Sequence, residues 1–426
     1  MRESAEQAFS CLKCLSTLLA EKGKTGGNHM TLASAGSAGS AGSAGSAGSA
    51  GSAGSAGSAG SAGSAGSAGS AGARTSLAGS GSSIMMSSAL NWATEGILDP
   101  TVVDVKRLSP ARGVDRIERI NPVFLRILLR ERLNEGLKVV SEPTSEKLVR
   151  NAALVSLDGA TVFRLLPPVP DATSDATMQA QSQLVADAYE LRSDRLQEIY
   201  LQQWDMISFL GATTHVNVIS QKWLLELLQA VQEAAMVNVA QVKHIVDVAR
   251  PVHLFPGAAP VVQTPQHSTI PSGHAAEGFT VAYVLSRLLG RTDAETVEGA
   301  NNIFRMAARI ATNRTVAGVH FPMDSMAGAC LGLTLGRIFW RRLAGDPDLD
   351  GAPACGGFNI DAQDFGAQDF NLSEFLSAAA NTGGAGKPWL LQRYPVPYPP
   401  AAAISEELDH IKNVNIAKEI DGYAMG

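Results

Sequence analysis

Thirteen consecutive Ser-Ala-Gly repeats occupy residues 34–72 of the 426-residue chain, and the stretch that follows, to Ser88, is mostly small and polar as well. A segment of this composition has too little apolar surface to offset the conformational entropy lost on folding. The repeat has the three-residue period of collagen but contains no proline, so a triple helix is not expected. We predict an N-terminal segment of unknown role over residues 1–33, a flexible low-complexity linker over residues 34–88, and a folded part beyond it.

Apolar residues in the folded part recur mainly at helical spacing. This periodicity predicts helices over residues 123–137, where Phe124, Ile127, Leu128 and Leu133 form the apolar set, over residues 180–210, and over residues 221–250. Pro251 is expected to end the third of these helices, because proline cannot continue a helix.

Two further helices are expected later in the chain. A capping-box pattern at residues 292–295 opens a helix towards Arg314, and Asp324 can cap a helix that runs to Arg342. Residues 159–166 come closest to a strand pattern. The predicted fold class is therefore all-α, with a helical-bundle catalytic domain over residues 89–344 and a loop-rich C-terminal segment over residues 345–426 packed on the bundle.

Charge and hydropathy exclude several classes of protein. The chain carries 34 Lys and Arg against 40 Asp and Glu, a net charge of −6, which disfavours a nucleic-acid partner or an anionic membrane surface. No uncharged apolar run reaches the roughly 20 residues that cross a bilayer, and the apolar patch over residues 8–20 lacks the positive flank of a secretory signal. Four scattered cysteines suit a reducing compartment. We expect a soluble protein of the cytoplasm, with export left open.

The first motif that carries chemistry is Lys243-x6-Arg250-Pro251. Seven residues are nearly two helical turns, so Lys243 and Arg250 are predicted to project from one helix face. Two converging cations can bind an anion. Such a pair can equally lie on a solvated helix face.

The second motif is Pro271-Ser272-Gly273-His274, directly before a helical pattern. Free backbone N–H groups and the positive end of the helix dipole make such a start an anion site, and Gly273 allows close approach. His274 then stands in the first turn beside the anion. The alternative is ordinary N-capping by Ser272 with a surface histidine.

The third motif is Arg314-x5-His320-x3-Asp324. Pro322 places His320 on a connecting turn, where its ring can enter a cavity. A carboxylate that binds one ring nitrogen fixes the tautomer and leaves the other nitrogen as a ligand or nucleophile. The alternative is a histidine that merely satisfies a helix-capping Asp324.

The three motifs together, in this order and spacing, resemble those of the type 2 phosphatidic acid phosphatase and vanadium haloperoxidase superfamily. Asn313 stands where that family usually has serine, and His244 where haloperoxidases often have an aromatic residue. The resemblance implies a helical bundle with one oxyanion site. It also implies that the site is formed by three cations, one hydroxyl and one backbone N–H: Lys243, Arg250, Arg314, Ser272 and Gly273.

The resemblance implies two chemistries for this site. In a phosphatase, His320 attacks phosphorus while Asp324 holds its ring, and His274 protonates the leaving alcohol. In a haloperoxidase, vanadate is the cofactor, His320 is the sole protein ligand of vanadium, and His274 handles the protons of hydrogen peroxide. The other reactants are then a halide and a small organic acceptor.

The branch is chosen on features outside the shared motifs. The chain lacks the membrane spans of the lipid phosphatases that it resembles, and it carries a large helical portion before Lys243. His267 lies seven residues before His274, where bromoperoxidases of the family carry a second active-site histidine; the alternative is an exposed loop residue. We favour a vanadium haloperoxidase that prefers bromide, with homo-oligomers possible, over a soluble acid phosphatase. A third hypothesis, from a different functional class, is a helical scaffold protein without catalytic activity.

Overall fold

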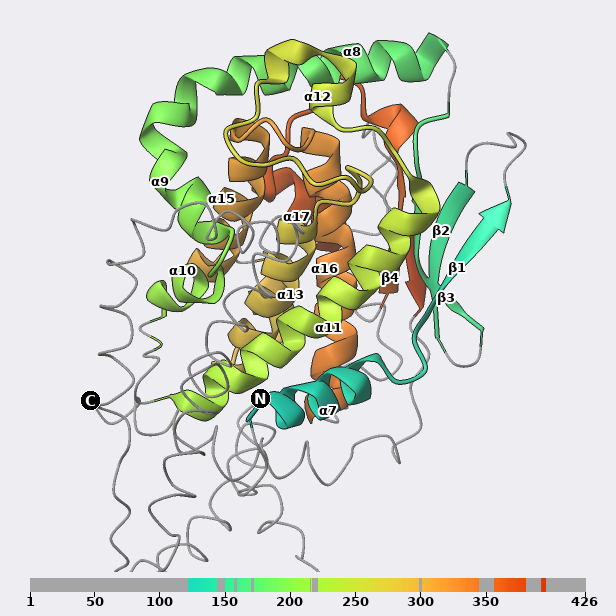
Figure 1. Cartoon of the computed structure of the whole chain (residues 1–426). Helices are drawn as coiled ribbons and strands as arrows, with labels where there is room; N and C mark the ends of the chain where they lie inside the picture. The colour runs from blue at the N-terminus through green and yellow to red at the C-terminus, as the bar shows by residue number, and fades with distance from the viewer. Residues whose placement is uncertain are drawn as a thin grey trace, which may run out of the picture.

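A computed structural model of the chain describes residues 122–143, 150–156, 159–169, 172–214, 216, 221–298, 301–344, 356–380 and 392–395. The predicted N-terminal segment (1–33) and linker (34–88) lie outside these residues. The described part is mostly helical, as predicted, and it has a loop-rich C-terminal part. Figure 1 shows long helices grouped in the centre, with a small sheet on one side. Among the described helices, none is both long and apolar enough to cross a lipid bilayer.

The elements follow one another in this order: α7 (Pro122–Asn134), β1 (Lys138–Pro143), β2 (Arg150–Val155), β3 (Thr161–Leu166), α8 (Ala172–Asp187), η4 (Ala188–Leu191), α9 (Arg192–Gln202), α10 (Ile207–Ala212), α11 (Lys222–Val246), α12 (Pro251–Leu254), η5 (Pro256–Ala258), α13 (Gly273–Leu288), α14 (Asp293–Glu298), α15 (Asn302–Val316), α16 (Pro322–Ala344), β4 (Gly356–Asp361), η8 (Ala362–Phe365), α17 (Leu372–Ala380) and β5 (Gln392–Pro395).

Helix α13 is the centre of the bundle. Every residue from Gly273 to Arg287 is buried, because α11, α15 and α16 all pack against this helix. The closest partner is α16, which turns Gly328, Gly332 and Gly336 towards it. A Cβ atom at Gly332 would lie 2.9 Å from the Cβ atom of Phe279, closer than two carbon atoms can pack. Glycines spaced four residues apart therefore allow the two helices to touch along their backbones.

The strands form one five-stranded sheet in the order β1-β2-β3-β4-β5. The pair β3–β4 is parallel, with Leu165 opposite Ile360, and the other pairs are antiparallel. Helices α11 and α16 pack against the sheet (Figure 1). The strand pattern predicted over residues 159–166 corresponds to β3, whereas β1, β2, β4 and β5 were not predicted. The C-terminal part also contributes Phe370 and Phe375, which pack edge-on against Phe279 of α13.

Several predicted helix boundaries were wrong. Helix α11 ends at Val246 rather than at residue 250, because Asp247 adopts a left-handed conformation (φ 42°) that stops the helix. The helix predicted from the capping box at Thr292 is two helices: the box caps the short α14, and the side chain of Asn301 caps α15 anew by accepting from the N–H groups of residues 303 and 304.

The apolar face predicted for α7 was also largely wrong. Phe124, Ile127 and Leu128 are 63%, 38% and 42% exposed. The buried face consists of Leu125, Leu129 and Leu133. Both sets repeat at helical spacing, so periodicity alone does not decide which of two apolar stripes packs on α11.

Candidate active site

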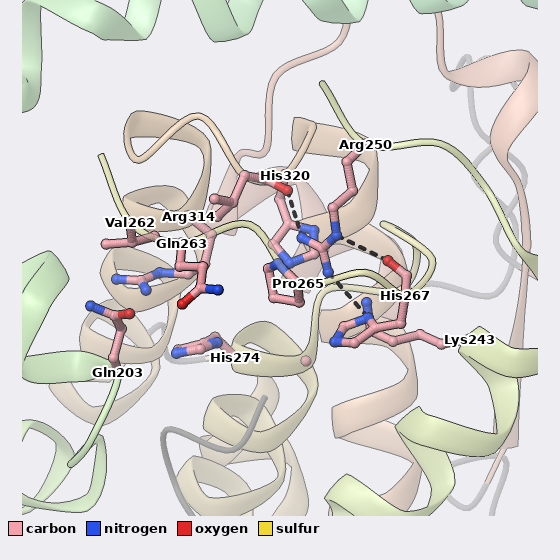
Figure 2. Close-up of a pocket in the computed structure, with 12 residues that line it drawn as sticks. Gln203, Lys243, Arg250, Val262, Gln263, Pro265, His267, His274, Arg314 and His320 are labelled. Atoms are coloured by element: carbon pink, nitrogen blue, oxygen red, sulfur yellow. Dashed lines mark hydrogen bonds between the residues drawn. The ribbon is translucent and has the colours of Figure 1, made fainter. Parts of the chain in front are cut away.

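The three motifs come together around one pocket at the N-terminal end of α13 (Figure 2). Seven of the nine predicted site residues line it. The lining comes from the ends of α9, α11 and α15, the starts of α12 and α13, the loop after η5 and the turn before α16: Gln203, Lys243, Arg250, Val262, Gln263, Pro265, His267, Gly273, His274, Arg314, Val319 and His320. The remaining two predicted residues, Ser272 and Asp324, lie directly behind this lining.

Lys243 and Arg250 converge, but not by the route that we predicted. Lys243 stands in the last turn of α11, while Arg250 lies beyond the helix end, as the N-cap of α12. The sharp turn at Asp247 folds the chain back and brings the two side chains to the same pocket. The prediction that one helix face carries both cations was therefore wrong, although both do line the pocket.

Backbone carbonyls hold the first two cations in place. The ammonium group of Lys243 donates to the carbonyls of Ser268 (2.6 Å) and Thr269 (3.0 Å). Arg250 donates through Nε to His267 O (2.9 Å) and through Nη1 to Val319 O (2.9 Å). Carbonyls are neutral acceptors, so they orient these groups without cancelling their charge.

The pocket carries an excess of positive charge. Burial, reinforced by Arg250, pulls the pKa of Lys243 well below its usual value, and the carboxylates of Asp324 and Glu277 oppose that shift. Burial also lowers the pKa values of Arg250 and Arg314 to about 10, so both guanidinium groups stay charged at neutral pH. Two buried guanidinium groups and the amine of Lys243 face one cavity and favour a bound anion, because an anion offsets the cost of desolvating positive charge.

Helix α13 starts at Gly273, directly after Ser272, and the capping alternative describes its first turn. Ser272 caps the helix: its hydroxyl accepts from the N–H of Ala275 at 3.5 Å, and its own N–H donates to Asp324 O at 2.8 Å. Gly273 lines the pocket, whereas Ser272 is fully buried behind it. The hydroxyl of Ser272 thus serves as the cap in this structure.

His320 is oriented by a carboxylate, as the third motif predicted. Its Nδ1 lies 3.1 Å from Oδ2 of Asp324, so Nε2 is the ring nitrogen left for the pocket. The same carboxylate oxygen accepts from the backbone N–H of Phe321 (2.8 Å) and from the hydroxyl of Thr269 (2.5 Å). Burial raises the pKa of Asp324 to about 6, against the opposing effect of the Thr269 hydrogen bond. Burial together with Arg250 and Lys243 keeps the pKa of His320 well below its usual value.

Two more histidines complete the pocket. His267 lies against Arg250, with Nδ1 3.1 Å from Nη2 of that residue, and its pKa falls to about 4 because of burial and the nearby Lys243 and Arg250. Burial and the charge of Arg314 keep the pKa of His274 well below its usual value, and the backbone of Gln202 opposes that shift. The Nε2 atoms of both rings are buried and find no hydrogen-bond partner within the described ranges. Both are thus available to a bound molecule.

Sequence reasoning missed several residues here. Thr269, Gln202, Gln203 and Gln263 belong to no motif, yet Thr269 contacts the carboxylate of Asp324 and both Gln203 and Gln263 line the pocket. A threonine three residues before a capping serine indicates only a local turn. The glutamines gave no signal, because nothing in their neighbourhood indicates which distant helix they will face.

Residues 223–345 match the PAP2 superfamily model. Members of the PAP2 superfamily are generally enzymes, either phosphatases or haloperoxidases. The PAP2 segment begins inside α11 and ends just after α16, so it contains all nine predicted site residues. A comparison with curated proteins finds no match.

Proposed function

We propose that this protein is a vanadate-dependent haloperoxidase, which uses hydrogen peroxide to oxidise bromide in preference to chloride and halogenates small organic acceptors. The observation that carries the proposal is the charge arrangement around one histidine. Lys243, Arg250 and Arg314 line the pocket into which Nε2 of His320 opens, and Asp324 holds the opposite side of that ring. A trivalent oxyanion needs several cations and one nitrogen ligand, and this set supplies them.

The residues present fit vanadate. The pocket offers charged donors from three side chains, the N-terminal end of α13 at Gly273, and the unpartnered Nε2 of His274. Bound vanadate would supply the activation of hydrogen peroxide towards attack by halide. His320 would hold it through Nε2, and the three cations would neutralise its oxygens.

The protein's own groups also supply a proton carrier. His274 is neutral in the anion-free site because burial and Arg314 lower its pKa. A bound anion acts in the opposite direction, since a nearby negative charge favours the imidazolium form. His274 is therefore positioned to take and return a proton beside a bound anion.

His267 supports the haloperoxidase branch and the preference for bromide. It lies in the pocket rather than on an exposed loop, and its ring is fixed against Arg250 at 3.1 Å. A second titratable ring therefore lines the pocket in which peroxide would react. We expect His267→Phe to shift the balance of products towards chlorination.

The second candidate is an acid phosphatase acting on phosphomonoesters. It is favoured by the same pairing of His320 with Asp324, which suits a nucleophile that forms a phosphohistidine. His274 would then protonate the leaving alcohol. Phosphate and vanadate share charge and shape, so the cation set serves either one.

Two assays on one purified sample separate the candidates. Bromination and chlorination of monochlorodimedone are followed with hydrogen peroxide, with and without added orthovanadate, and p-nitrophenyl phosphate hydrolysis is followed without vanadate. We expect bromination that depends on vanadate. Rapid phosphate hydrolysis with no bromination between about pH 5 and 8, where histidines titrate, would favour the phosphatase. Neither activity, with no anion binding, would favour the scaffold.

His320→Ala is the decisive variant for either chemistry. It removes the nitrogen ligand or the nucleophile, so turnover should vanish while the fold is kept. Circular dichroism and the unfolding midpoint provide the control for folding. A variant that turns over at more than a few per cent of the wild-type rate, with vanadate bound normally, contradicts the assignment.

A further inference from the structure

Helix α9 lies outside the PAP2 segment, yet its last turn touches two residues of the pocket. Nη2 of Arg314 donates to the backbone carbonyl of Ile199 (3.1 Å) and to Oε1 of Gln202 (3.4 Å). The backbone of Gln202 also lies close enough to His274 to raise the pKa of that ring, against the larger effect of burial. The position of Arg314 thus depends on one turn of a helix that lies outside the three motifs.

The side chain of Gln202 is fixed in a single orientation. It is fully buried, and its Oε1 atom accepts from Nδ2 of Asn313 at 3.0 Å as well as from Arg314. An arginine only donates, so the oxygen rather than the nitrogen of the amide must face it. Asn313 is itself held from α9, since it donates to Glu198 (3.1 Å) and accepts from Arg195 (3.1 Å).

The acceptors offered to Arg314 are uncharged. Burial is what lowers the pKa of this guanidinium, and an amide and a carbonyl on α9 orient it without forming an ion pair. A carboxylate in the place of Gln202 would orient Arg314 equally well, but it would cancel the charge that an oxyanion needs. A neutral acceptor of this length therefore positions Arg314 and leaves its positive charge available to a bound anion.

We propose that Gln202 is a positioning residue of the anion site, which holds Arg314 through its side-chain oxygen while leaving the cationic charge of Arg314 available to the oxyanion. The inference rests on the proposed anion site and applies to vanadate and phosphate alike.

The test compares Gln202→Glu and Gln202→Leu with the wild-type full-length protein. Dissociation constants for orthovanadate and for inorganic phosphate are measured by equilibrium titration, together with the unfolding midpoint. Gln202→Glu keeps the shape and the acceptor but adds a charge, so we expect anion affinity to fall roughly tenfold to a hundredfold with the midpoint maintained, because a contact with a charged group is at stake. Gln202→Leu should lower both affinity and midpoint.

Gln229 offers a matched control. Its Oε1 atom accepts from Nη1 of Arg126 at 2.9 Å in a buried contact, and Arg126 also pairs with Glu226. It lies fourteen residues before Lys243 on α11, roughly 21 Å along the helix axis. Gln229→Glu and Gln229→Leu should leave anion affinity unchanged, whatever they do to stability.

The outcomes separate this inference from the proposed function. Anion binding by Gln202→Glu within a factor of two of wild type would overturn the positioning role alone. If that variant does not fold, Gln202→Leu with wild-type affinity overturns it instead. Failure of the wild-type protein to bind either anion would overturn the proposed function and the positioning role together.

Discussion

The contact between α13 and α16 predicts a large effect for a single methyl group at Gly332. An alanine Cβ atom there would overlap the carbonyl oxygen of Ala276, and would lie 3.1 Å from the carbonyl carbon of that residue and 2.9 Å from Cβ of Phe279. These are backbone and Cβ atoms, which cannot turn aside as the end of a long side chain can. Carbon atoms pack at about 3.5–4.0 Å, so the helices must separate by roughly half an ångström or more.

The cost follows from two opposing terms. Forcing an extra carbon atom into a packed contact costs about 1–3 kcal/mol, and alanine recovers up to about 1 kcal/mol over glycine inside a helix. Because backbone atoms are the ones that clash, the upper part of this cost applies, and we expect Gly332→Ala to lose about 1–2 kcal/mol of the free energy of unfolding. Chemical denaturation followed by circular dichroism measures this value.

Gly278→Ala is the matched control, with the same substitution inside the partner helix. Its Cβ atom would meet only Cβ of Ala307, at 4.0 Å, an ordinary contact. The helix-propensity gain then stands alone, so this variant should be more stable than the wild type by up to about 1 kcal/mol. Equal free energies of unfolding for Gly278→Ala and Gly332→Ala would refute the reasoning.

Gly332→Ala should also affect the anion site. The N–H of Ser272 donates to Asp324 O at 2.8 Å, which ties the start of α13 to the first turn of α16. Separating the helices should move His274 relative to His320. Gly332→Ala should therefore bind orthovanadate more weakly, whereas Gly278→Ala should bind it as the wild type does.

Three further predictions concern the pocket. Arg250→Ala should weaken orthovanadate binding about thirtyfold, since one charge-assisted contact is worth about 2 kcal/mol; an unchanged dissociation constant contradicts this. Thr269→Val removes the hydroxyl that donates to Asp324, so turnover should fall about tenfold at unchanged anion affinity; if Thr269→Ser does not restore it, the threonine acts through packing. The pKa of His267 drops from 6.5 unfolded to about 4 folded, so the unfolded state binds the extra proton and stability is lost as pH falls from about 6.5 to 4. We expect the unfolding midpoint of His267→Phe to fall less than that of the wild type across this pH range. Equal falls for the two proteins would contradict the prediction.

Local sequence determined the parts of the site that depend on neighbouring residues. Ser272 caps the helix that follows it, and Asp324 reaches His320 across a single turn, because both contacts span only three or four residues. The glycine in the second motif and the proline at residue 322 set where helices begin. These features were predictable, as was the mostly helical class.

Tertiary structure decided the rest, because the contacts involved join distant parts of the chain. Lys243 and Arg250 converge through a left-handed turn at Asp247 that helical periodicity does not reveal. Gln202 contacts Arg314, which lies 112 positions later in the sequence. Strand β3 pairs with β4, although helices α8 to α16 lie between the two strands in the sequence. The pairing of short strands and the choice of acceptor for a buried cation depend on which surfaces meet, and that is fixed only when the helices pack.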